Sequence, residues 1–224
     1  MKSYNLKKPI QTRVKQQLWK QQSRLFPRAK RLLDISISLI AIVLLSPVLL
    51  IVSILIKRES DGSALFKQQR IGLNGIPFTM LKFRSMRNDA PAHRNQLESQ
   101  NEMQTGVLFK IKHDPRITHI GKIIRKTSID ELPQLINVLR GDMSLVGPRP
   151  PLPNEVSQYS INDRGRLNVL PGITCLWQVS GRSDIPFEQQ VKLDLKYIER
   201  QSLKFDFILL LKTIPAVINA RGAY

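Results

Sequence analysis

One stretch of the chain, IIRKTSIDELPQLINVLRGDMSLVGPRP (123–150), is dense in groups that handle phosphates. Its two adjacent carboxylates, Asp130 and Glu131, precede a helical pattern that we expect from about residue 130 to 139. Pro133 fits best in the first turn, so both carboxylates would lie at the positive end of this helix, which favours their ionised form. An ionised carboxylate suits a nucleophile or a metal ligand. The competing interpretation is structural: Ser128 and Glu131 have the spacing of a capping box, and on this tetrad alone capping is favoured.

Basic side chains accompany these carboxylates. A guanidinium group binds two phosphate oxygens at once, and a rigid backbone lowers the entropy cost of that contact. Arg149, for example, stands between two prolines. Taken singly, each residue would more often be a surface charge, but as a set they suggest a diphosphate substrate. The candidates for binding phosphates or the nucleotide are Lys82, Arg84, Arg125, Arg149 and Arg182.

Other chemistries have little support in the sequence. His93, His113 and His119 are spaced irregularly, and Cys175 lies far from them, so a zinc site is not indicated. The chain contains no P-loop and no glycine-rich dinucleotide turn. Because Cys175 is the single cysteine, no internal disulfide can form, which suits a reducing compartment.

The charge balance indicates an anionic partner. The 35 Lys and Arg residues exceed the 17 Asp and Glu residues by 18. Ten basic and no acidic residues fall within positions 1–31, directly before a long apolar run. This adjacency favours lipid headgroups over nucleic acid as the partner. A solvated basic tail is the alternative.

The apolar run, Ile35–Ile56, contains 22 residues without a charge, enough for one helix to cross a bilayer. Two interpretations compete: a single membrane span with a proline kink, and a re-entrant hairpin. Both flanks are rich in Lys and Arg, as cytoplasmic flanks are. The Ser46-Pro47 pair divides the run into halves of about ten residues, each reaching about the midplane. The Ser46 hydroxyl can satisfy part of the backbone that Pro47 exposes, so we predict the re-entrant hairpin.

The elements that must position the chemistry follow this run. Residues 64–86 predict a β-hairpin around Asn74-Gly75. The four prolines of 146–155 predict an extended, rigid connector, and residues 172–182 a strand followed by a turn. Helical spacing predicts a helix over 186–202. The apolar segment 205–218 contains a lysine and a proline, which favours an interfacial or core helix over a second span.

The same residues carry a resemblance to a known family. KRLLDISISLIAIVLLSPVLLIVSILIK, QQRIGLNGIPFTMLKFRSM, IRKTSIDELPQLINVLRGDMSLVGPRP, PGITCLWQVSGR and the closing GAY resemble, in order, bacterial sugar transferases of the monotopic phosphoglycosyl transferase family. The resemblance runs from about Arg28 to Tyr224. It departs from the family pattern at Cys175, where glycine is usual.

The resemblance implies an enzyme that initiates exopolysaccharide or glycan synthesis. Such an enzyme moves a sugar 1-phosphate from a UDP-sugar to polyprenyl (undecaprenyl) phosphate and releases UMP. Carried over by motif, Asp130 would be the nucleophile and Glu131 its acidic neighbour, with roles in the Mg²⁺ site and in proton handling. Arg125, Arg149 and Arg182 would hold phosphates or the nucleotide, with Lys82 near the active site. The family's re-entrant helix breaks at the position of Ser46-Pro47.

We therefore expect an α+β protein: a mainly helical cytoplasmic catalytic domain with a small β-hairpin, seated on the bacterial inner membrane by a re-entrant helix-break-helix. The expected parts are a basic segment 1–30, the membrane element 31–58, and a catalytic domain 59–224 with an interfacial helix at about 204–219. That exposed helix leaves room for a homodimer. Two alternatives remain open, a metal-dependent phosphohydrolase and a non-enzymatic basic membrane adaptor with one span.

Overall fold

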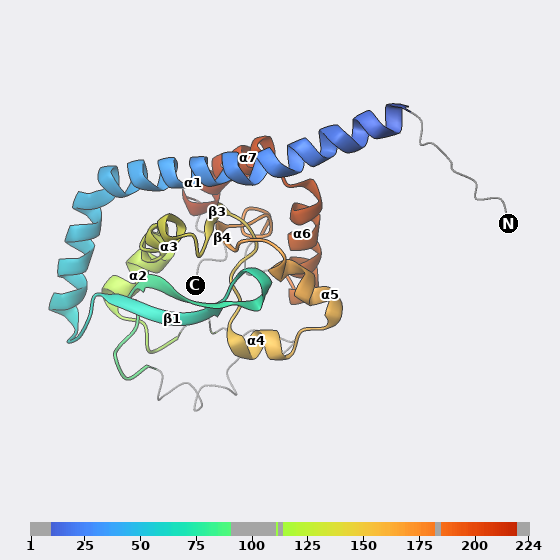
Figure 1. Cartoon of the computed structure of the whole chain (residues 1–224). Helices are drawn as coiled ribbons and strands as arrows, with labels where there is room; N and C mark the ends of the chain where they lie inside the picture. The colour runs from blue at the N-terminus through green and yellow to red at the C-terminus, as the bar shows by residue number, and fades with distance from the viewer. Residues whose placement is uncertain (1–9, 91–110, 112–113, 182–184, 219–224) are drawn as a thin grey trace.

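The computed structural model describes residues 10–90, 111, 114–181 and 185–218, with the side chains of the first helix described from Leu25 onward. Helices surround two small two-stranded sheets in this part of the chain (Figure 1), so the fold is α+β, as predicted. In chain order the elements are α1 (Ile10–Glu59), β1 (Leu65–Ile71), the 3₁₀ turn η1 (Leu73–Gly75), β2 (Pro77–Phe83), α2 (His119–Lys126), the 3₁₀ turn η3 (Ile129–Glu131), α3 (Gln134–Arg140), β3 (Ser144–Val146), α4 (Pro153–Ser157), α5 (Ile161–Arg164), the 3₁₀ turn η4 (Gly165–Leu167), β4 (Gly172–Thr174), α6 (Phe187–Arg200) and α7 (Leu203–Ile218).

Helix α1 contains the whole apolar run and changes direction sharply part-way along it (Figure 1). Pro47 lies inside the helix, which continues on both sides of it. The element is therefore one bent helix rather than two helices with a break. Proline bends a helix because it lacks an N–H and its ring clashes with the carbonyl four residues earlier. By length and composition, the part from Leu25 to Glu59 is long and apolar enough to cross a membrane.

Ser46 replaces part of the hydrogen bonding that Pro47 removes. The carbonyl that loses its donor is that of Val43, and the Ser46 hydroxyl donates to this oxygen at 2.8 Å. A bare carbonyl in lipid would cost several kcal/mol. The predicted use of this serine is therefore confirmed.

Both limbs of α1 pack against the same body. On the N-terminal limb, Lys30 forms an ion pair with Asp206 of α7 at 2.5 Å. On the C-terminal limb, Val52 and Ile56 are buried in a cluster with Phe83 of β2. In a straight helix, Lys30 and Ile56 would lie about 40 Å apart. The bend therefore lets both limbs of the helix contact the same domain.

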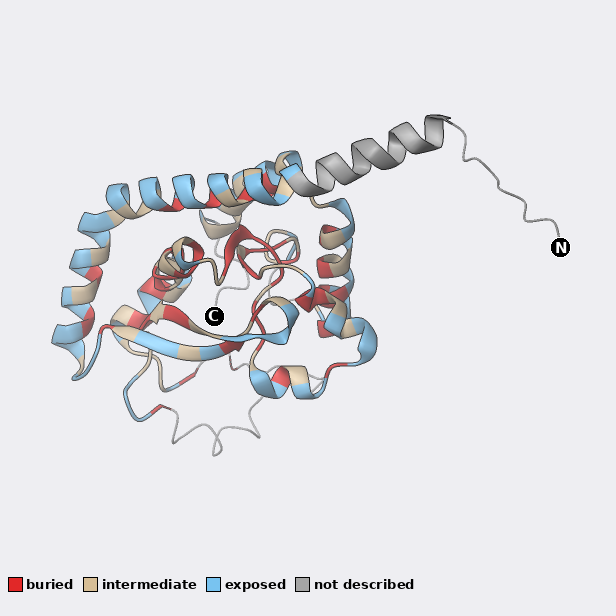
Figure 2. Ribbon diagram, in the orientation of Figure 1, coloured by how far each residue is buried: buried red, intermediate tan, exposed pale blue. Residues whose placement is uncertain are grey.

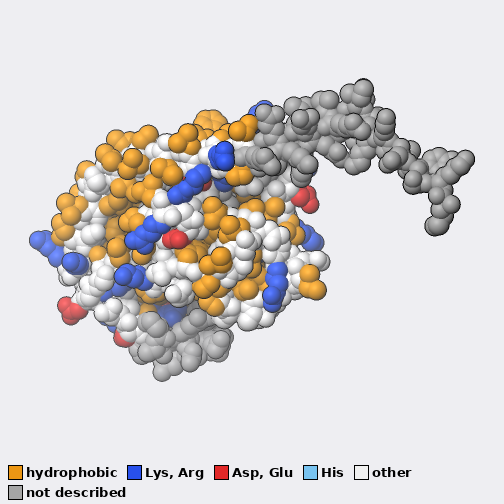
Figure 3. All heavy atoms as spheres, viewed as in Figure 1, with side chains coloured by type: hydrophobic (Ala, Val, Ile, Leu, Met, Phe, Trp, Pro, Cys, Tyr) orange, Lys and Arg blue, Asp and Glu red, His pale blue; other side chains and the backbone are white. Residues whose placement is uncertain are grey.

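The outer face of α1 is apolar and exposed. Buried residues of α1 face the domain (Figure 2), and apolar side chains cover the outer edge of the molecule along this helix (Figure 3). Helix α7 lies beside α1 and adds Phe207, Leu211, Ile214 and Ile218, which are all exposed. Contiguous apolar surfaces of this kind mark membrane or protein contacts. Together with the length of the helix, this surface indicates membrane association.

The hairpin forms where the sequence predicts it, with β1 and β2 antiparallel. Asn74 in the connecting turn has φ 56°, a left-handed conformation that asparagine tolerates. In the register, Arg70 lies opposite Phe78 and Lys82 lies opposite Phe66. Directly opposed residues share a face, and alternate residues along a strand do too. Arg70 and Lys82 therefore project from the same face of the hairpin.

A second sheet, in which β3 and β4 pair in parallel, was predicted only in its β4 strand. The two strands continue into a very close approach of Gly147 and Gly172, where a Cβ on Gly172 would lie 2.1 Å from the Gly147 nitrogen. Only glycine permits this approach. The Gly172 N–H donates to the Pro148 carbonyl at 2.8 Å, which fixes the backbone next to Arg149.

The predicted helix over 130–139 begins later than expected. Asp130 and Glu131 lie in η3, and α3 starts at Gln134, because Pro133 has no N–H to continue the hydrogen-bonded ladder. Gly141 ends α3 with φ 94°, in the left-handed conformation typical of glycine after a helix. The two carboxylates are thus in a tight turn before the helix, not in its first turn.

The proline-rich connector is extended only in its first part. Residues 147–152 form no helix or strand, as predicted, but Pro153 begins α4. The prediction of an extended segment as far as residue 155 was therefore wrong for its last three residues. Proline is favourable at the first position of a helix, where no N–H is needed.

The predicted helices near the C-terminus are present as α6 and α7. Phe187 and Val191 of α6 are buried against Tyr159, while Tyr197 packs in the main core. That core lies between the hairpin, α3, β3 and α7, and its buried members are Met80, Leu135, Val138, Met143, Leu145, Val146, Tyr197 and Leu209. The predicted basic segment, up to Arg24, lies outside the described side chains.

Candidate active site

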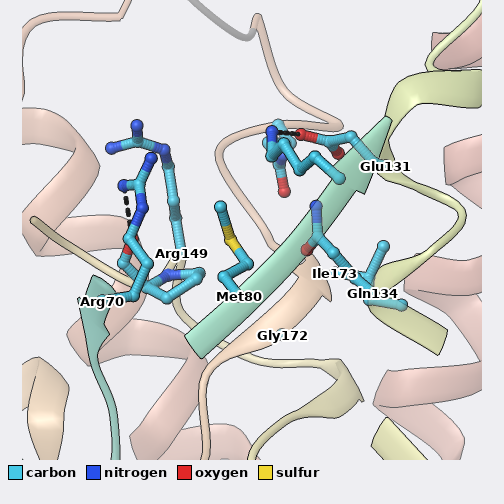
Figure 4. A pocket seen from close by; sticks show the side chains of 10 residues that line it. Arg70, Met80, Glu131, Gln134, Arg149, Gly172 and Ile173 are labelled. Atoms are coloured by element: carbon cyan, nitrogen blue, oxygen red, sulfur yellow. Dashed lines mark hydrogen bonds and ion pairs between the residues drawn. The ribbon is translucent and has the colours of Figure 1, made fainter. Parts of the chain in front are cut away.

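A small, partly open hollow lies between the hairpin, η3, α3, β4 with the turn after it, and the segment that follows β3. Figure 4 shows the side chains around it, with Arg70 and Arg149 toward one end and Glu131 toward the other. The charged lining residues are three cations and one carboxylate. The lining residues are Arg70, Met80, Lys82, Glu131, Gln134, Arg149, Pro150, Gly172, Ile173 and Gln178.

Lys82 joins the hairpin to the two carboxylates. Its Nζ donates to Glu131 Oε1 at 2.7 Å and lies 3.9 Å from Asp130 Oδ2. Asp130 is buried, with 8% of its surface exposed, while the Glu131 side chain is 28% exposed. The sequence-predicted group of Lys82, Asp130 and Glu131 is therefore brought together in three dimensions.

The environments of the two carboxyl groups move their pKa values in opposite directions. Burial raises the pKa of Asp130 to about 6, with the Lys82 charge opposing this shift and the Glu131 charge adding to it. For Glu131, burial acts in the same direction, but the charge and hydrogen bond of Lys82, together with the charges of Arg149 and Arg70, outweigh it and lower the pKa. The expectation that a helix end keeps Asp130 readily ionised was wrong, because burial dominates. Two carboxyl groups with separated pKa values suit different roles in one reaction.

The capping interpretation of this tetrad is contradicted. Ser128 has φ 57°, a left-handed backbone, and its side chain makes no capping hydrogen bond. Glu131 accepts from Lys82 rather than reaching back to Ser128. The Asp130–Glu131 pair is thus available for chemistry.

Asn137 of α3 fixes the distance between η3 and the hairpin. Its side-chain oxygen accepts from the Leu81 N–H at 2.9 Å, and its nitrogen donates to the Thr79 carbonyl at 2.7 Å. The same nitrogen lies 3.0 Å from Asp142 Oδ2, so Asp142 has the structural role that the helix end suggests. This buried amide satisfies backbone groups on β2 and so holds Lys82 near the carboxylates.

Of the predicted phosphate-binding arginines, Arg149 lines the hollow and Arg125 does not. Arg149 Nη1 lies 3.6 Å from Oε1 of the buried Glu155, which holds the guanidinium at the edge of the hollow. Arg125, on α2, is half-buried. Its charge opposes the rise in the pKa of Asp130 that burial causes.

Arg84 lies elsewhere. Its Nη1 donates to the Asp61 carbonyl at 2.5 Å and its Nη2 to the Ser60 carbonyl at 2.7 Å, just after the end of α1. The arginine therefore ties β2 to α1 and does not line the hollow, because the strand ends at Phe83 and the alternation that would place it beside Lys82 stops there. Arg182 lies outside the described residues.

Three polar or charged side chains of the hollow were not predicted as site residues: Arg70, Gln134 and Gln178. Arg70 was identifiable, because the Asn74-Gly75 turn sets a hairpin register that puts residues 70 and 82 on one face. No sequence pattern places Gln134 and Gln178 at the hollow, since their positions there depend on how η3 and β4 pack.

The donor set suits a hard divalent cation held mainly by a substrate. Among the described residues, no group of three or more His, Cys, Asp or Glu could hold a metal. Asp130 and Glu131 are adjacent, however, and Mg²⁺ is commonly bound by one or two carboxylates together with substrate phosphates. The residues present therefore fit Mg²⁺ when it accompanies a diphosphate.

Comparison with known families bears on this arrangement. The family model described as bacterial sugar transferase matches residues 25–220, which include both limbs of α1 and every residue that lines the hollow. The chain belongs to the bacterial sugar transferase family. The hollow thus lies in the part of the chain that defines the family, and the resemblance noted in the sequence is confirmed.

Curated relatives cover most of the chain. It is 48% identical over 196 residues to the galactosyl transferase CpsE of Streptococcus agalactiae serotype III, covering 87% of this chain and 43% of that protein. It is 40% identical over 199 residues to the exopolysaccharide production protein ExoY of Sinorhizobium fredii, covering 88% of each. It is 40% identical over 205 residues to the UDP-glucose:undecaprenyl-phosphate glucose-1-phosphate transferase of Caulobacter vibrioides, covering 87% of this chain and 72% of that enzyme. The chain therefore spans less than half of the first relative and most of the other two.

Proposed function

We propose that this sugar transferase moves a sugar 1-phosphate from a UDP-sugar to undecaprenyl phosphate and releases UMP, as the initiating step of exopolysaccharide or glycan synthesis. The name of the Caulobacter relative describes the transfer of glucose 1-phosphate from UDP-glucose to undecaprenyl phosphate. The observation that carries the proposal is the buried Asp130, which lies beside Lys82 and Glu131, and these two residues line a hollow together with two arginines.

In the first step, a carboxylate oxygen of Asp130 attacks the β-phosphorus of the UDP-sugar. A bond forms between this oxygen and phosphorus, and the bond from the β-phosphorus to the bridging oxygen breaks, so UMP leaves with the electron pair. Burial makes Asp130 a better nucleophile than a solvated carboxylate, because fewer water molecules must be displaced from it. Lys82 offsets repulsion between the carboxylates and the phosphates.

In the second step, a phosphate oxygen of undecaprenyl phosphate attacks the phosphorus of the aspartyl phosphosugar. The aspartyl oxygen–phosphorus bond breaks, which restores the Asp130 carboxylate and forms undecaprenyl diphosphate sugar. Splitting the transfer in this way predicts ping-pong kinetics. The sugar itself stays unassigned, since no contact in the hollow separates galactose from glucose.

Asp130 and Glu131 would hold Mg²⁺ together with the diphosphate. Bound there, the ion would supply positive charge to the phosphoryl oxygens as the transfer proceeds. Before the substrate arrives, Lys82 is held by its 2.7 Å hydrogen bond to Glu131, so its positive charge already lies beside both carboxylates.

The membrane part of the proposal is a re-entrant α1 on the cytoplasmic face of the inner membrane. The packing of both limbs on one domain and the basic flanks on both sides of the apolar run support it. In this arrangement residues 31–58 form the membrane element and 59–224 the catalytic domain, with α7 at the interface and the basic segment 1–30 near the headgroups. The site then meets a water-soluble donor and a lipid acceptor at the same surface.

The decisive experiment measures UMP release by the full-length protein in lipid nanodiscs, with and without undecaprenyl phosphate. We expect multiple turnovers only when the lipid is present, and mass spectrometry after donor addition should find a sugar phosphate on Asp130. Asp130→Asn should abolish both signals, whereas Asp61→Asn, the same change at an exposed position, should not. Sustained UMP release without lipid would indicate a phosphohydrolase, and no UMP release at all would leave a non-enzymatic adaptor.

A further inference from the structure

Arg70 is a buried cation that the reaction described above does not use. It is 6% exposed at the end of β1, and it forms no ion pair with a carboxylate in the described part of the chain. Its guanidinium group instead donates to neutral oxygens. Nε and Nη2 lie 3.1 and 2.7 Å from Gln68 Oε1, and Nη1 lies 2.9 Å from the Pro150 carbonyl. A buried charge without a counter-charge is unfavourable unless something else supplies one.

A second guanidinium group, that of Arg149, lies near the first. Both line the hollow and lie toward its same end (Figure 4). Burial and then the charge of Arg149 lower the pKa of Arg70 to about 9, which reflects this proximity. At this end, Glu155 pairs with Arg149 at 3.6 Å and caps α4 through the Leu152 N–H. The charge of Glu131 also acts on Arg70, but its carboxylate is hydrogen-bonded to Lys82. Each of these two carboxylates is thus engaged with another cation, and neither forms an ion pair with Arg70 in the described part of the chain.

The two arginines are held together by the backbone. Arg70 Nη1 donates to the Pro150 carbonyl, and the Ile71 N–H donates to the Pro151 carbonyl at 3.0 Å. The end of β1 is therefore bonded directly to the proline segment that carries Arg149. Because both segments are stiff, the two like charges cannot move apart without breaking these bonds.

Donor groups remain for a ligand. A guanidinium group has five N–H bonds, and the contacts of Arg70 among the described residues use three, which leaves one on each terminal nitrogen. Gln178 also lines the hollow, and its buried Oε1 has no hydrogen-bond partner in the described part of the chain. Turning this amide about its axis would present its N–H₂ group instead.

We propose that Arg70 and Arg149 form a clamp that binds a phosphate group of a substrate at the end of the hollow opposite Glu131. This inference rests on the proposed function and adds a residue to it. A phosphate would supply the missing negative charge and accept from both guanidinium groups, with charge-assisted hydrogen bonds at each. Clamp and carboxylates would then hold the substrate from two sides. The phosphate belongs either to the nucleotide or to undecaprenyl phosphate, which share this chemistry.

The test compares Arg70→Gln and Arg70→Lys with Lys67→Gln in the full-length protein in nanodiscs. Lys67 lies on the same strand and is exposed, so its variant loses the same charge away from the hollow. For Arg70→Gln we expect the KM for one substrate to rise about 10- to 100-fold. Arg70→Lys should recover only part of the lost affinity, because an ammonium group cannot bind two phosphate oxygens at once as a guanidinium group does. Lys67→Gln should change neither KM.

The kinetic pattern identifies the phosphate. A higher KM for the UDP-sugar together with weaker inhibition by UMP places the clamp on the nucleotide. A higher KM for undecaprenyl phosphate alone places it on the lipid. If both KM values of the folded Arg70 variants equal those of the wild type, the clamp is wrong.

Thermal unfolding with and without 1 mM UMP, or with undecaprenyl phosphate, separates binding from folding. Stabilisation by one of these two ligands should shrink in Arg70→Lys, even where Arg70→Gln folds poorly. An equal rise in both KM values that follows a lower unfolding temperature, with ligand stabilisation intact, would show a purely structural arginine and overturn the proposal. An inactive wild-type protein would instead contradict the proposed function, whereas an active wild type with unaffected variants would contradict only the clamp.

Discussion

Lys82 Nζ lies 2.7 Å from Glu131 Oε1, so the direct hydrogen bond of this lysine goes to Glu131, and its charge acts on Asp130 from 3.9 Å. The two carboxyl groups consequently differ although they are adjacent in the chain. Glu131 is stabilised as an anion, while the pKa of the buried Asp130 is raised to about 6. The protonation of Asp130, and not that of Glu131, should therefore change between pH 5 and 7.

The pH dependence of the first step should report Asp130. Because only the ionised carboxylate attacks, kcat/KM for the UDP-sugar should fall about tenfold per pH unit below about 6 and be flat just above it. The value applies to the free enzyme, which is what kcat/KM reports. An acidic limb near pH 4, the range of an ordinary aspartate, would contradict the effect of burial.

Replacing Lys82 should move this acidic limb. Lys82 is the largest of the influences that lower the pKa of Asp130, so its removal in Lys82→Met should raise that pKa above 6 and shift the limb to higher pH. Activity at pH 7 should fall at least tenfold. Lys122→Gln, at an exposed position on α2, is the matched control and should leave the profile unchanged. An unshifted limb in Lys82→Met would mean that the lysine charge does not reach Asp130.

Asp130→Asn should stabilise the fold while abolishing transfer. A carboxyl group whose pKa is raised in the folded state destabilises that state once the unfolded chain ionises, above pH ~4. The gain from Asn should therefore grow between pH ~4 and ~6 and stay constant above, at about 1–3 kcal/mol. Denaturant unfolding at pH 4, 6 and 8 measures it. A variant that is less stable than wild type at pH 8 would show that burial of the ionised Asp130 carboxylate does not destabilise the fold.

Pro47→Ala should disturb the return of α1 to the domain. Restoring the N–H removes the cause of the bend, and a straighter helix cannot keep both Lys30 and Ile56 against one body. A cysteine at exposed Gln69 reports this, since the native Cys175 is buried. With Pro47 present, a membrane-impermeant thiol reagent should label Gln69→Cys only from the cytoplasmic side. In the Pro47→Ala background, labelling from the outer side should appear, whereas outer labelling of the otherwise native protein would refute the re-entrant arrangement.

Asp194→Asn should destabilise the domain. Asp194 of α6 forms a buried ion pair with Arg166, whose guanidinium group also lies near the rings of Tyr159 and Phe187. Removing one partner leaves the other charge buried and unpaired, which costs about 3–5 kcal/mol. Glu188→Gln, at an exposed position on the same helix, is the control. Equal free energies of unfolding for Asp194→Asn and wild type would show that Arg166 finds another partner.

Much of the local structure was predictable because neighbours in the chain determine it. The hairpin follows from Asn74-Gly75 between alternating residues, the bend in α1 from Pro47, and the end of α3 from Gly141. The use of the Ser46 hydroxyl also follows from sequence, since the carbonyl that Pro47 leaves free is only four residues away. Family membership could likewise be recognised from motifs in order.

The composition of the hollow was predictable only in part. Lys82, Glu131 and Arg149 come from segments far apart in the chain, and the structure brings them together. Arg84 shares the basic motif of Lys82 but ties β2 to the end of α1. Arg70, which no motif assigned, lines the hollow because the hairpin register and the proline segment place it there.

The sequence by itself thus determined the residue types available for chemistry and the presence of a long apolar helix. The tertiary structure decided which charges meet and how strongly burial acts on them. Periodicity, turns and proline effects depend on bonds within a few residues, which the sequence displays. The raised pKa of Asp130 and the proximity of Arg70 to Arg149 depend on distances and on excluded water, and packing sets both only when the chain has folded.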